Sequence, residues 1–356
     1  MRALVAREVG GTPRVEDVEL PDPGPGEVRV AIRAAGVCHS DLSMMNGTLA
    51  PPYPLVLGHE AAGVVVEAGA GVGLPVGTHV VLNWAPPCRD CWFCRHGEPW
   101  LCERAGAPAA ARGRTSAGEQ LHVTLGLGAL AEQVVVPARA VIPVPDELPF
   151  ADAALLGCAV LTGVGAVRRT AAVAAGESVL VIGLGGVGLA VVSAARAAGA
   201  DPVLAVDSSA AKAGLAVAAG ATEFLPADDA LSRAVRARTG GRGVDHAVEC
   251  VGRGETIRTA WRATRRGGRV TVVGMGARDD VVGLSALEIF HSARTLRSSV
   301  YGSSDPERHL PDLARSVLDG GLDLAPLITD RTDLDGAAEA FARMARGEGA
   351  RTVVTP

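Results

Sequence analysis

The densest group of chemically active residues in the chain is a run of four cysteines, Cys88, Cys91, Cys94 and Cys102. The spacing Cys-x2-Cys-x2-Cys-x7-Cys places four thiolates where they can surround one tetrahedral Zn²⁺. Buried or disulfide-bonded thiols are the alternative, which a reducing compartment disfavours. Because four ligands close the coordination shell and leave no position for substrate, the spacing predicts a structural zinc.

A second set of metal-ligand types is spread along the chain: Cys38 in Gly36-Val37-Cys38-His39-Ser40-Asp41, His59 in Gly58-His59-Glu60, and Cys158 after Gly157. Two thiolates and one imidazole leave a fourth zinc position open for water or substrate. Spacing alone does not show that the three residues meet. Taken singly, Cys158 fits a small buried residue and His59 fits a core histidine.

A glycine-rich turn follows the apolar run 178–182, with the sequence Gly183-Leu184-Gly185-Gly186-Val187-Gly188. In such a Gly-x-Gly-x-x-Gly turn the glycines permit a tight bend, close approach of a pyrophosphate, and close packing of the following helix. Asp207 stands nineteen residues after Gly188, where a carboxylate accepts hydrogen bonds from an adenosine ribose. A carboxylate there repels a 2′-phosphate, which favours NAD over NADP. A helix N-cap is the alternative role for Asp207.

The elements that must position these residues fall into two regions. Short alternating runs broken by Pro/Gly clusters up to about residue 150 predict antiparallel strands with many turns. From residue 178 onward, apolar runs alternate with Ala-rich stretches, which predicts βαβ units with strands near 178–183, 202–207, 223–225, 244–249 and 269–274. At 356 residues the chain exceeds one hydrophobic core, so two domains are expected.

The composition and charge of the chain limit the classes of ligand that it can be expected to bind. A formal charge of −5 with mixed charges offers no basic surface for nucleic acid or an anionic membrane, so a small-molecule ligand is expected. The first residues carry no signal-peptide core, which predicts a cytoplasmic protein. The most membrane-like stretch, 179–195, contains four glycines and fits a strand, turn and helix better than a membrane span.

Together these motifs resemble the zinc-dependent alcohol dehydrogenases of the medium-chain dehydrogenase/reductase superfamily, from the first strand to the last six residues. The resemblance implies an α/β fold in two domains. A mostly β, GroES-like catalytic domain is expected over residues 1–159 and 301–356. A Rossmann domain with a doubly wound parallel sheet, which binds NAD, is expected over residues 160–300.

The resemblance also assigns roles to residues around the open zinc site. Cys38, His59 and Cys158 would be its ligands, and Glu60 matches a carboxylate behind the metal. Asp41 matches a carboxylate that orients the ligand histidine. Ser40 matches the hydroxyl that receives the proton of the alcohol, while Ser43 stands where many relatives have a histidine that finishes the relay. The proton would then pass to water.

Cofactor contacts follow from the same resemblance. His39 and Arg351 match cations that hold the NAD pyrophosphate, and Lys212 matches a contact to the adenosine ribose. Thr162 and Val187 match positions that line the nicotinamide. The expected cofactors are therefore one NAD and two Zn²⁺ per chain, one catalytic and one structural.

Four apolar residues fall at family positions that line the substrate pocket: Leu49, Trp84, Leu125 and Met275. They predict a cavity for hydrophobic or aromatic alcohols. Glutathione-dependent formaldehyde dehydrogenases of the family use an acidic residue where Leu49 stands and an arginine near Gly106. Both are absent here, so a glutathione adduct is disfavoured.

The implied activity is reversible NAD-linked oxidation of a primary or aromatic alcohol to its aldehyde. The alternatives are a dehydrogenase of another thiol–aldehyde adduct, a specialised aldehyde reductase, and an inactive NAD-binding relative. The last usually lacks a zinc ligand, and none is missing here. The long segment 104–130 resembles a loop of the dimeric branch, which favours a homodimer. The leftover Cys250 fits a packed small residue better than a reactive thiol.

Overall fold

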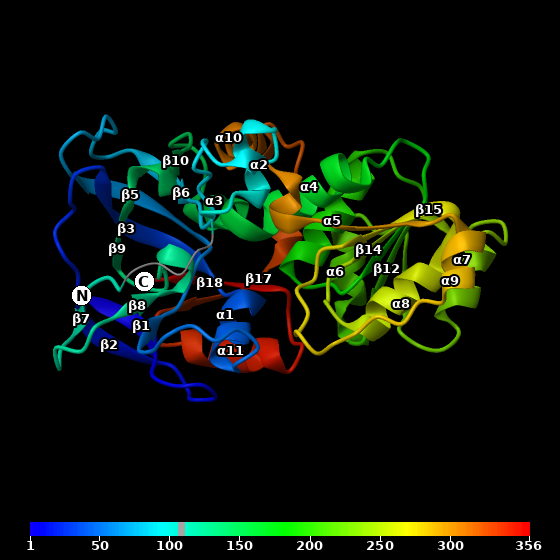
Figure 1. Ribbon diagram of the computed structural model, residues 1–356, viewed down its shortest axis with the longest axis horizontal. Helices are drawn as coiled ribbons and strands as arrows, with labels where there is room; N and C mark the ends of the chain where they lie inside the picture. The colour runs from blue at the N-terminus through cyan, green and yellow to red at the C-terminus, as the bar shows by residue number, and fades with distance from the viewer. Residues whose placement is uncertain (106–110) are drawn as a thin grey trace. The chain divides into compact units, whose positions relative to one another are not determined.

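The computed structural model divides the chain into two compact units (Figure 1). Unit 1 comprises Met1–Ala159, Asp305–Asp319 and Ile328–Pro356, and unit 2 comprises Val160–Ser304 and Gly320–Leu327. The structure describes residues 1–105 and 111–356. The position near Gly106 that bears on glutathione recognition, and part of the segment 104–130, therefore lie outside the described residues.

Unit 1 is built on a seven-stranded sheet centred on β3 (Glu27–Gly36). Val28, Val30 and Ile32 are buried on alternate positions of β3, as expected for a strand with one face on the core. The strands run in the order β10-β6-β5-β3-β18-β17, with β9 also paired to β3. Their bounds are β5 (Ala61–Ala68), β6 (His79–Leu82), β9 (Gln133–Pro137), β10 (Val141–Pro143), β17 (Ile328–Asp333) and β18 (Arg351–Thr355).

A five-stranded sheet of order β7-β2-β1-β4-β8 and several helices complete unit 1. The first strand, expected at the N-terminus, is β1. The bounds are β1 (Arg2–Ala6), β2 (Arg14–Glu19), β4 (Leu55–Val56), β7 (Arg114–Thr115), β8 (His122–Val123), α1 (His39–Met45), α2 (Trp92–Arg95), α3 (Phe150–Leu155), α10 (Pro306–Leu318) and α11 (Ala337–Ala345). Short 3-10 turns lie at Pro99–Leu101, Thr124–Gly126 and Ala138–Ala140.

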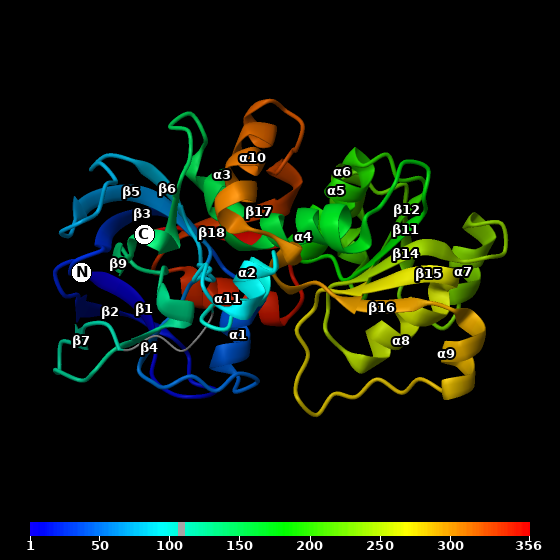
Figure 2. The ribbon, with the colours of Figure 1, turned by 45° about the horizontal axis from the view of Figure 1, so that its top comes forward.

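Unit 2 contains a six-stranded parallel sheet of order β13-β12-β11-β14-β15-β16, with α5 and α6 on one face and α7 and α8 on the other (Figures 1 and 2). Its central strands β11 and β12 are buried except for Asp207 at the end of β12, because helices cover both faces. The bounds are β11 (Val179–Ile182), β12 (Val203–Asp207), β13 (Glu223–Pro226), β14 (Val244–Glu249), β15 (Thr264–Val272), β16 (Thr295–Ser298), α4 (Leu161–Gly165), α5 (Gly186–Ala197), α6 (Ala213–Ala218), α7 (Leu231–Arg238), α8 (Gly254–Ala263) and α9 (Ala286–Ser292).

This confirms the expected α/β fold with a doubly wound parallel sheet. Four of the five expected strands match to within one or two residues, whereas β15 begins five residues earlier than expected, at Thr264. Strand β16 does not follow from the sequence pattern, because this four-residue strand at the sheet edge is exposed throughout and shows no alternation of apolar residues.

The unit boundaries also differ in detail from the expected ranges. Residues 301–304 stay with unit 2, because Arg169 donates to the carbonyl of Gly302 and to the hydroxyl of Ser304. Gly320–Leu327 lies within the range expected for the catalytic domain, but it belongs to unit 2 because its 3-10 turn Ala325–Leu327 contacts α5 and α6.

The longest apolar helical stretch is Phe150–Ala171, with a mean hydropathy of 1.8 over its most apolar window. It runs through α3, the wide turn Leu156–Val160, α4 and the wide turn Ala166–Ala171. Of that window, 78% is buried, as in the core helix of a folded protein. The stretch 179–195 forms β11, the glycine turn and most of α5, as expected.

Candidate active site

The four cysteines of the predicted structural site come together in one lobe, residues 88–102, called the zinc lobe below. Their sulfur atoms all lie within 4.8 Å of one another. The turn α2 and the 3-10 turn Pro99–Leu101 supply the curvature between them. The backbone N–H groups of Cys91 and Cys88 lie 3.3 Å from the sulfurs of Cys88 and Cys102 respectively, and so donate toward thiolates.

All seven cysteines of the chain are free thiols, so the lobe is not held by disulfides. Hydrogen bonds from the backbone of Asp90 and Cys91 lower the pKa of Cys88 to about 6. Burial, and then Cys91, raise the pKa of Cys94 to about 12. Four adjacent thiols cannot all ionise without a compensating cation, and four sulfurs at this separation fit one tetrahedral Zn²⁺.

Cys38, His59 and Cys158 form a second group, with one donor atom from each within 4.8 Å of the others and all three residues buried. Strand pairing creates this group. The end of β3 leads into Cys38, and β5 pairs beside it with Ala35 opposite Ala61, which brings His59 alongside. Cys158 comes from the wide turn Leu156–Val160, and its sulfur lies 3.4 Å from His59 Nε2. Two sulfurs and one nitrogen fit a zinc ion with an open position.

Asp41 lies behind His59, as expected from the resemblance. Its Oδ2 is 2.9 Å from His59 Nδ1, at contact distance but without the alignment of a full hydrogen bond. Its Oδ1 accepts a 2.8 Å hydrogen bond from the backbone N–H of Gly58. Gly58 has φ +100°, and a Cβ there would come within 2.3 Å of the Leu130 nitrogen, so the loop that presents His59 requires glycine.

Glu60 is fully buried beside this group and faces Arg351. Glu60 Oε2 accepts a 3.1 Å hydrogen bond from the Ala159 N–H, and Oε1 lies 3.2 Å from Arg351 Nε. Gly36 makes room for the carboxylate, because a Cβ on Gly36 would lie 2.3 Å from Oε1. Burial raises the pKa of Glu60 to about 7, although the positive charge of Arg351 acts in the opposite direction.

The ion pair of Arg351 with Glu60 does not follow from the sequence pattern. The side chain is 3% exposed and also donates a 2.6 Å hydrogen bond to the Val37 carbonyl. The pairing of β18 with β3, with Val353 opposite Gly36, delivers it there. No local pattern predicts contacts between Arg351 and residues as distant in the sequence as Val37 and Glu60. A pyrophosphate contact for Arg351 stays a prediction.

The other residues expected near the metal lie on α1. His39 begins the helix and is exposed, while Ser40 and Ser43 are half-buried. All three lie within five residues after Cys38, on the helix α1 that begins shortly after β3 ends.

The predicted nucleotide turn joins β11 to α5 in unit 2. Gly188 is essential to its shape, because a Cβ on Gly188 would lie 1.8 Å from the Gly183 carbonyl oxygen. Gly185, at the N-cap of α5, is exposed and has no atom within 4 Å of its Cβ position. The turn therefore leaves open space at a helix N-terminus, as a pyrophosphate requires.

Asp207 ends β12 and supports this turn. Its Oδ2 accepts a 2.8 Å hydrogen bond from the Leu184 N–H and lies 3.3 Å from Lys212 Nζ, and its Oδ1 accepts from the Ser209 N–H. A carboxylate offers about four acceptor positions, so one remains for a ribose hydroxyl. Asp207 thus has a local structural role as well, though in a turn rather than as the N-cap of a regular helix.

Thr162 in α4 and Val187 in α5 are both half-buried in unit 2. Their helices pack closely, since a Cβ on Gly163 would lie 2.9 Å from the Val187 carbonyl oxygen. Burial raises the pKa of Cys250, which keeps this thiol protonated and unreactive.

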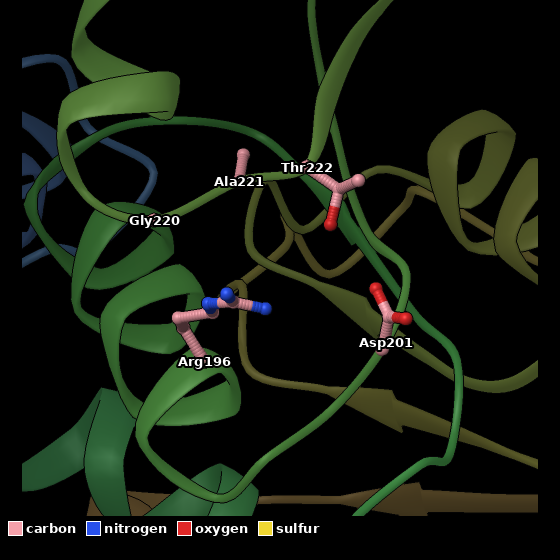
Figure 3. Close-up of a pocket in the computed structure, with 5 residues that line it drawn as sticks. All are labelled: Arg196, Asp201, Gly220, Ala221 and Thr222. Atoms are coloured by element: carbon pink, nitrogen blue, oxygen red, sulfur yellow. The ribbon is translucent and has the colours of Figure 1, made fainter.

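Three of the four residues predicted for the substrate pocket, Leu49, Trp84 and Leu125, are half-buried and pack on the main core of unit 1. Met275 belongs to unit 2 and is 51% exposed. A hollow of about 340 Å³ elsewhere in unit 2 is lined by Arg196, Asp201 and Gly220–Thr222 (Figure 3). It contains none of the predicted site residues.

Similar proteins belong to families of zinc-binding dehydrogenases, which agrees with the two groups of zinc-ligand residues described above. Residues 24–146 match the family model of the alcohol dehydrogenase GroES-like domain, and residues 186–316 match that of the zinc-binding dehydrogenases. An S-(hydroxymethyl)glutathione dehydrogenase from Synechocystis is 35% identical over 99% of both chains. The chain belongs to the zinc-dependent alcohol dehydrogenases of the medium-chain dehydrogenase/reductase superfamily.

Solved structures of similar dehydrogenases cover nearly the whole chain. An alcohol dehydrogenase zinc-binding domain protein from Burkholderia ambifaria has a TM-score of 0.93 at 32% identity, covering 99% of this chain and 98% of that one. Benzyl alcohol dehydrogenase from Acinetobacter calcoaceticus has a TM-score of 0.91 at 26% identity, with the same coverage. This alcohol dehydrogenase accordingly uses zinc and a nicotinamide dinucleotide, with its two cysteine-containing groups as the zinc sites.

Proposed function

We propose that the enzyme catalyses reversible, NAD-linked oxidation of a hydrophobic or aromatic primary alcohol to its aldehyde. The observation that carries the proposal is the buried group of Cys38, His59 and Cys158, in the same unit as the apolar residues Leu49 and Trp84. A three-ligand site supports catalysis because it leaves a position for substrate. Similarity to a benzyl alcohol dehydrogenase supports the substrate class.

Zinc held by Cys38, His59 and Cys158 would supply a Lewis acid that favours loss of the hydroxyl proton of the alcohol. The chain's own residues do the rest. Asp41 holds the ring of His59 in one orientation. The Ser40 hydroxyl takes up the proton and passes it on, and Ser43 cannot act as a base at neutral pH, so water receives it. The turn Gly183–Gly188 and Asp207 would hold the dinucleotide, which would supply the hydride acceptor.

The preference for NAD over NADP rests on Asp207. Its carboxylate stands at the end of β12, where it would repel a 2′-phosphate and could accept a hydrogen bond from the 2′-hydroxyl of NAD. Lys212, 3.3 Å away, partly offsets this charge, so the preference depends on the balance between the two side chains.

A thiol adduct is the second candidate substrate, because a relative that is 35% identical is named for S-(hydroxymethyl)glutathione. Leu49 argues against it in this chain. An apolar side chain at this position cannot pair with the charged ammonium and carboxylate groups of glutathione, whereas it can pack on a benzylic ring.

The deciding experiment is NAD⁺ reduction followed at 340 nm with benzyl alcohol, aliphatic alcohols of increasing length, and formaldehyde mixed with glutathione. Zinc content is measured on the same sample. Two zinc ions per chain with turnover of benzylic or longer alcohols support the proposal. Turnover confined to the glutathione adduct establishes the second candidate, and two zinc ions without turnover on any of them indicate a specialised aldehyde or an inactive relative.

We further propose a cytoplasmic homodimer. The edge strand β16 is exposed along its whole length, and the adjacent α9 exposes Leu287 and Phe290 at 67% and 79%. An open strand edge beside exposed apolar side chains favours association. Light scattering of the enzyme and of Phe290→Asp tests this: a dimer that dissociates in the variant supports the proposal, and a wild-type monomer contradicts it.

A further inference from the structure

Arg89 lies in the zinc lobe, between two of its cysteines, and has an uncommon backbone conformation. Its φ is +61°, in the left-handed region that normally favours glycine. An arginine at such a position is retained at a conformational cost. Its side chain should therefore contribute something that glycine could not.

The guanidinium of Arg89 reaches across unit 1 to the start of α10. Nη1 and Nη2 donate to the two carboxylate oxygens of Asp305 at 2.8 and 2.7 Å, and Nη2 lies 2.7 Å from Glu307 Oε2. This is the parallel two-bond geometry that arginine makes with carboxylates, and it fixes direction as well as distance. In both ribbon views α2 of the lobe lies beside α10 (Figures 1 and 2).

Asp305 occupies the N-cap of α10, where an aspartate usually accepts from the N–H groups of the first turn. Here the side chain makes no capping hydrogen bond, and both oxygens accept from Arg89 instead. The zinc lobe thus contributes to holding the first turn of α10, where the Asp305 N–H also donates to His309 Nδ1 at 3.0 Å.

The position of Asp305 in the chain gives this contact wider importance. Asp305 is the first residue of unit 1 after the chain leaves unit 2 at Ser304. Hydrogen bonds hold the residues before it inside unit 2, because Arg169 donates to the Gly302 carbonyl and to the Ser304 hydroxyl. In the same segment Tyr301, Gly302 and Ser303 all have positive φ. An arginine therefore binds the chain on each side of the point where it passes from unit 2 to unit 1. Arg169 binds the residues before this point, and Arg89 binds Asp305 after it.

We propose that Arg89 is a positioning residue that couples metal occupancy of the zinc lobe to the order of the segment 305–312, where the chain re-enters unit 1. Metal binding holds residues 88–91 in the conformation that presents the guanidinium, and the ion pairs then hold the first turns of α10. By linkage the coupling works in both directions, so an ordered segment 305–312 also raises the affinity of the lobe for zinc. We expect this higher affinity to show as slower release of zinc.

The test uses the zinc-loaded enzyme and two readouts that need no substrate: hydrogen–deuterium exchange of peptides covering 305–312, and release of zinc to a chromogenic chelator. In Arg89→Ala we expect faster exchange in that segment and about fivefold faster zinc release in one of the two kinetic phases, the fold-change that corresponds to loss of a partly exposed ion pair. Arg89→Lys should be intermediate, because an ammonium cannot make the two-bond contact.

Arg95→Ala is the matched control, since Arg95 is an exposed arginine of the same lobe that pairs with Asp90. It should leave both readouts at wild-type values. Asp305→Asn should accelerate zinc release as Arg89→Ala does. Removal of zinc from the wild-type enzyme should accelerate exchange at 305–312.

Wild-type zinc release in both Arg89→Ala and Asp305→Asn would overturn the proposal, as would equal acceleration in the Arg95→Ala control. Faster exchange at 305–312 without any change in zinc release would also overturn it, because Arg89 would then stabilise α10 without affecting zinc binding by the lobe. Since neither readout involves turnover, the result is independent of which alcohol the enzyme oxidises.

Discussion

Two substitutions of Asp41 can test separately its effect on the orientation of His59 and its effect on the stability of the loop that carries His59. This is possible because the two oxygens of the buried carboxylate have different partners. Oδ2 faces His59 Nδ1 at 2.9 Å, and Oδ1 accepts from the Gly58 N–H at 2.8 Å. Asp41→Asn can keep the second contact through its amide oxygen. Its NH₂ group would then face the ring nitrogen that must carry a proton while Nε2 points to the metal.

We therefore expect Asp41→Asn to fold normally and to bind its catalytic zinc about 10–100-fold more weakly, the usual effect of removing a partner of a metal-ligating histidine. The zinc of the four-cysteine lobe should keep its wild-type affinity. Asp41→Ala should lose metal affinity to a similar extent and also leave the buried Gly58 N–H without an acceptor. That unsatisfied group costs about 1–3 kcal/mol of unfolding free energy.

The assay is zinc per chain after equilibrium dialysis against buffers of graded free zinc, with thermal unfolding on the same samples. Asp90→Asn, an exposed carboxylate in the zinc lobe, serves as the control and should retain both metals. If Asp41→Asn binds two zinc ions with wild-type affinity and turns over at the wild-type rate, the orienting role assigned to Asp41 is wrong.

Three further predictions concern unit 2. Gly188→Ala should abolish folding of the nucleotide turn, because its Cβ would lie 1.8 Å from a backbone oxygen. Gly185→Ala should unfold like the wild type in thermal scans. It should nevertheless bind NAD more weakly in titration calorimetry, since its methyl group enters the open space at the turn. Asp207→Asn should lower the ratio of the NADP to the NAD dissociation constant by about tenfold, equivalent to about 1.4 kcal/mol; an unchanged ratio would show that the carboxylate does not select the cofactor. Burial raises the pKa of Asp245, but hydrogen bonds from Ser178 and Arg265 outweigh it and lower that pKa to about 2. The resulting stability, on the order of 1 kcal/mol after allowance for solvent screening, is present above about pH 4 and lost as the pH falls toward 2, so the gap in urea unfolding between wild type and Asp245→Asn should shrink from pH 6 to pH 3.5 and would stay constant if the shift were absent.

The chemistry of the site and the class of fold could be predicted because both depend on short stretches of sequence. The four cysteines of the zinc lobe lie within one loop, so their spacing alone limits how their sulfurs can be arranged. The glycine turn between an apolar strand and a helix is equally local, and Gly188 is required there because a Cβ would meet the carbonyl oxygen of Gly183. The burial of β11 and β12 appears in the sequence as continuous apolar runs.

Contacts between distant segments were decided by the tertiary structure. Cys38, His59 and Cys158 span 120 residues and meet because β5 pairs beside the end of β3 while the wide turn after α3 delivers the last ligand. The pairing of β18 with β3 likewise turns Arg351 toward Glu60, and the fold of unit 1 brings Arg89 to Asp305 across 216 residues. The distances between these side chains depend on the register of paired strands and on the path of the chain between them. The hydrophobic periodicity of a single segment predicts neither. The sequence determines which groups can do chemistry, and long-range pairing determines which of them come within reach of one another.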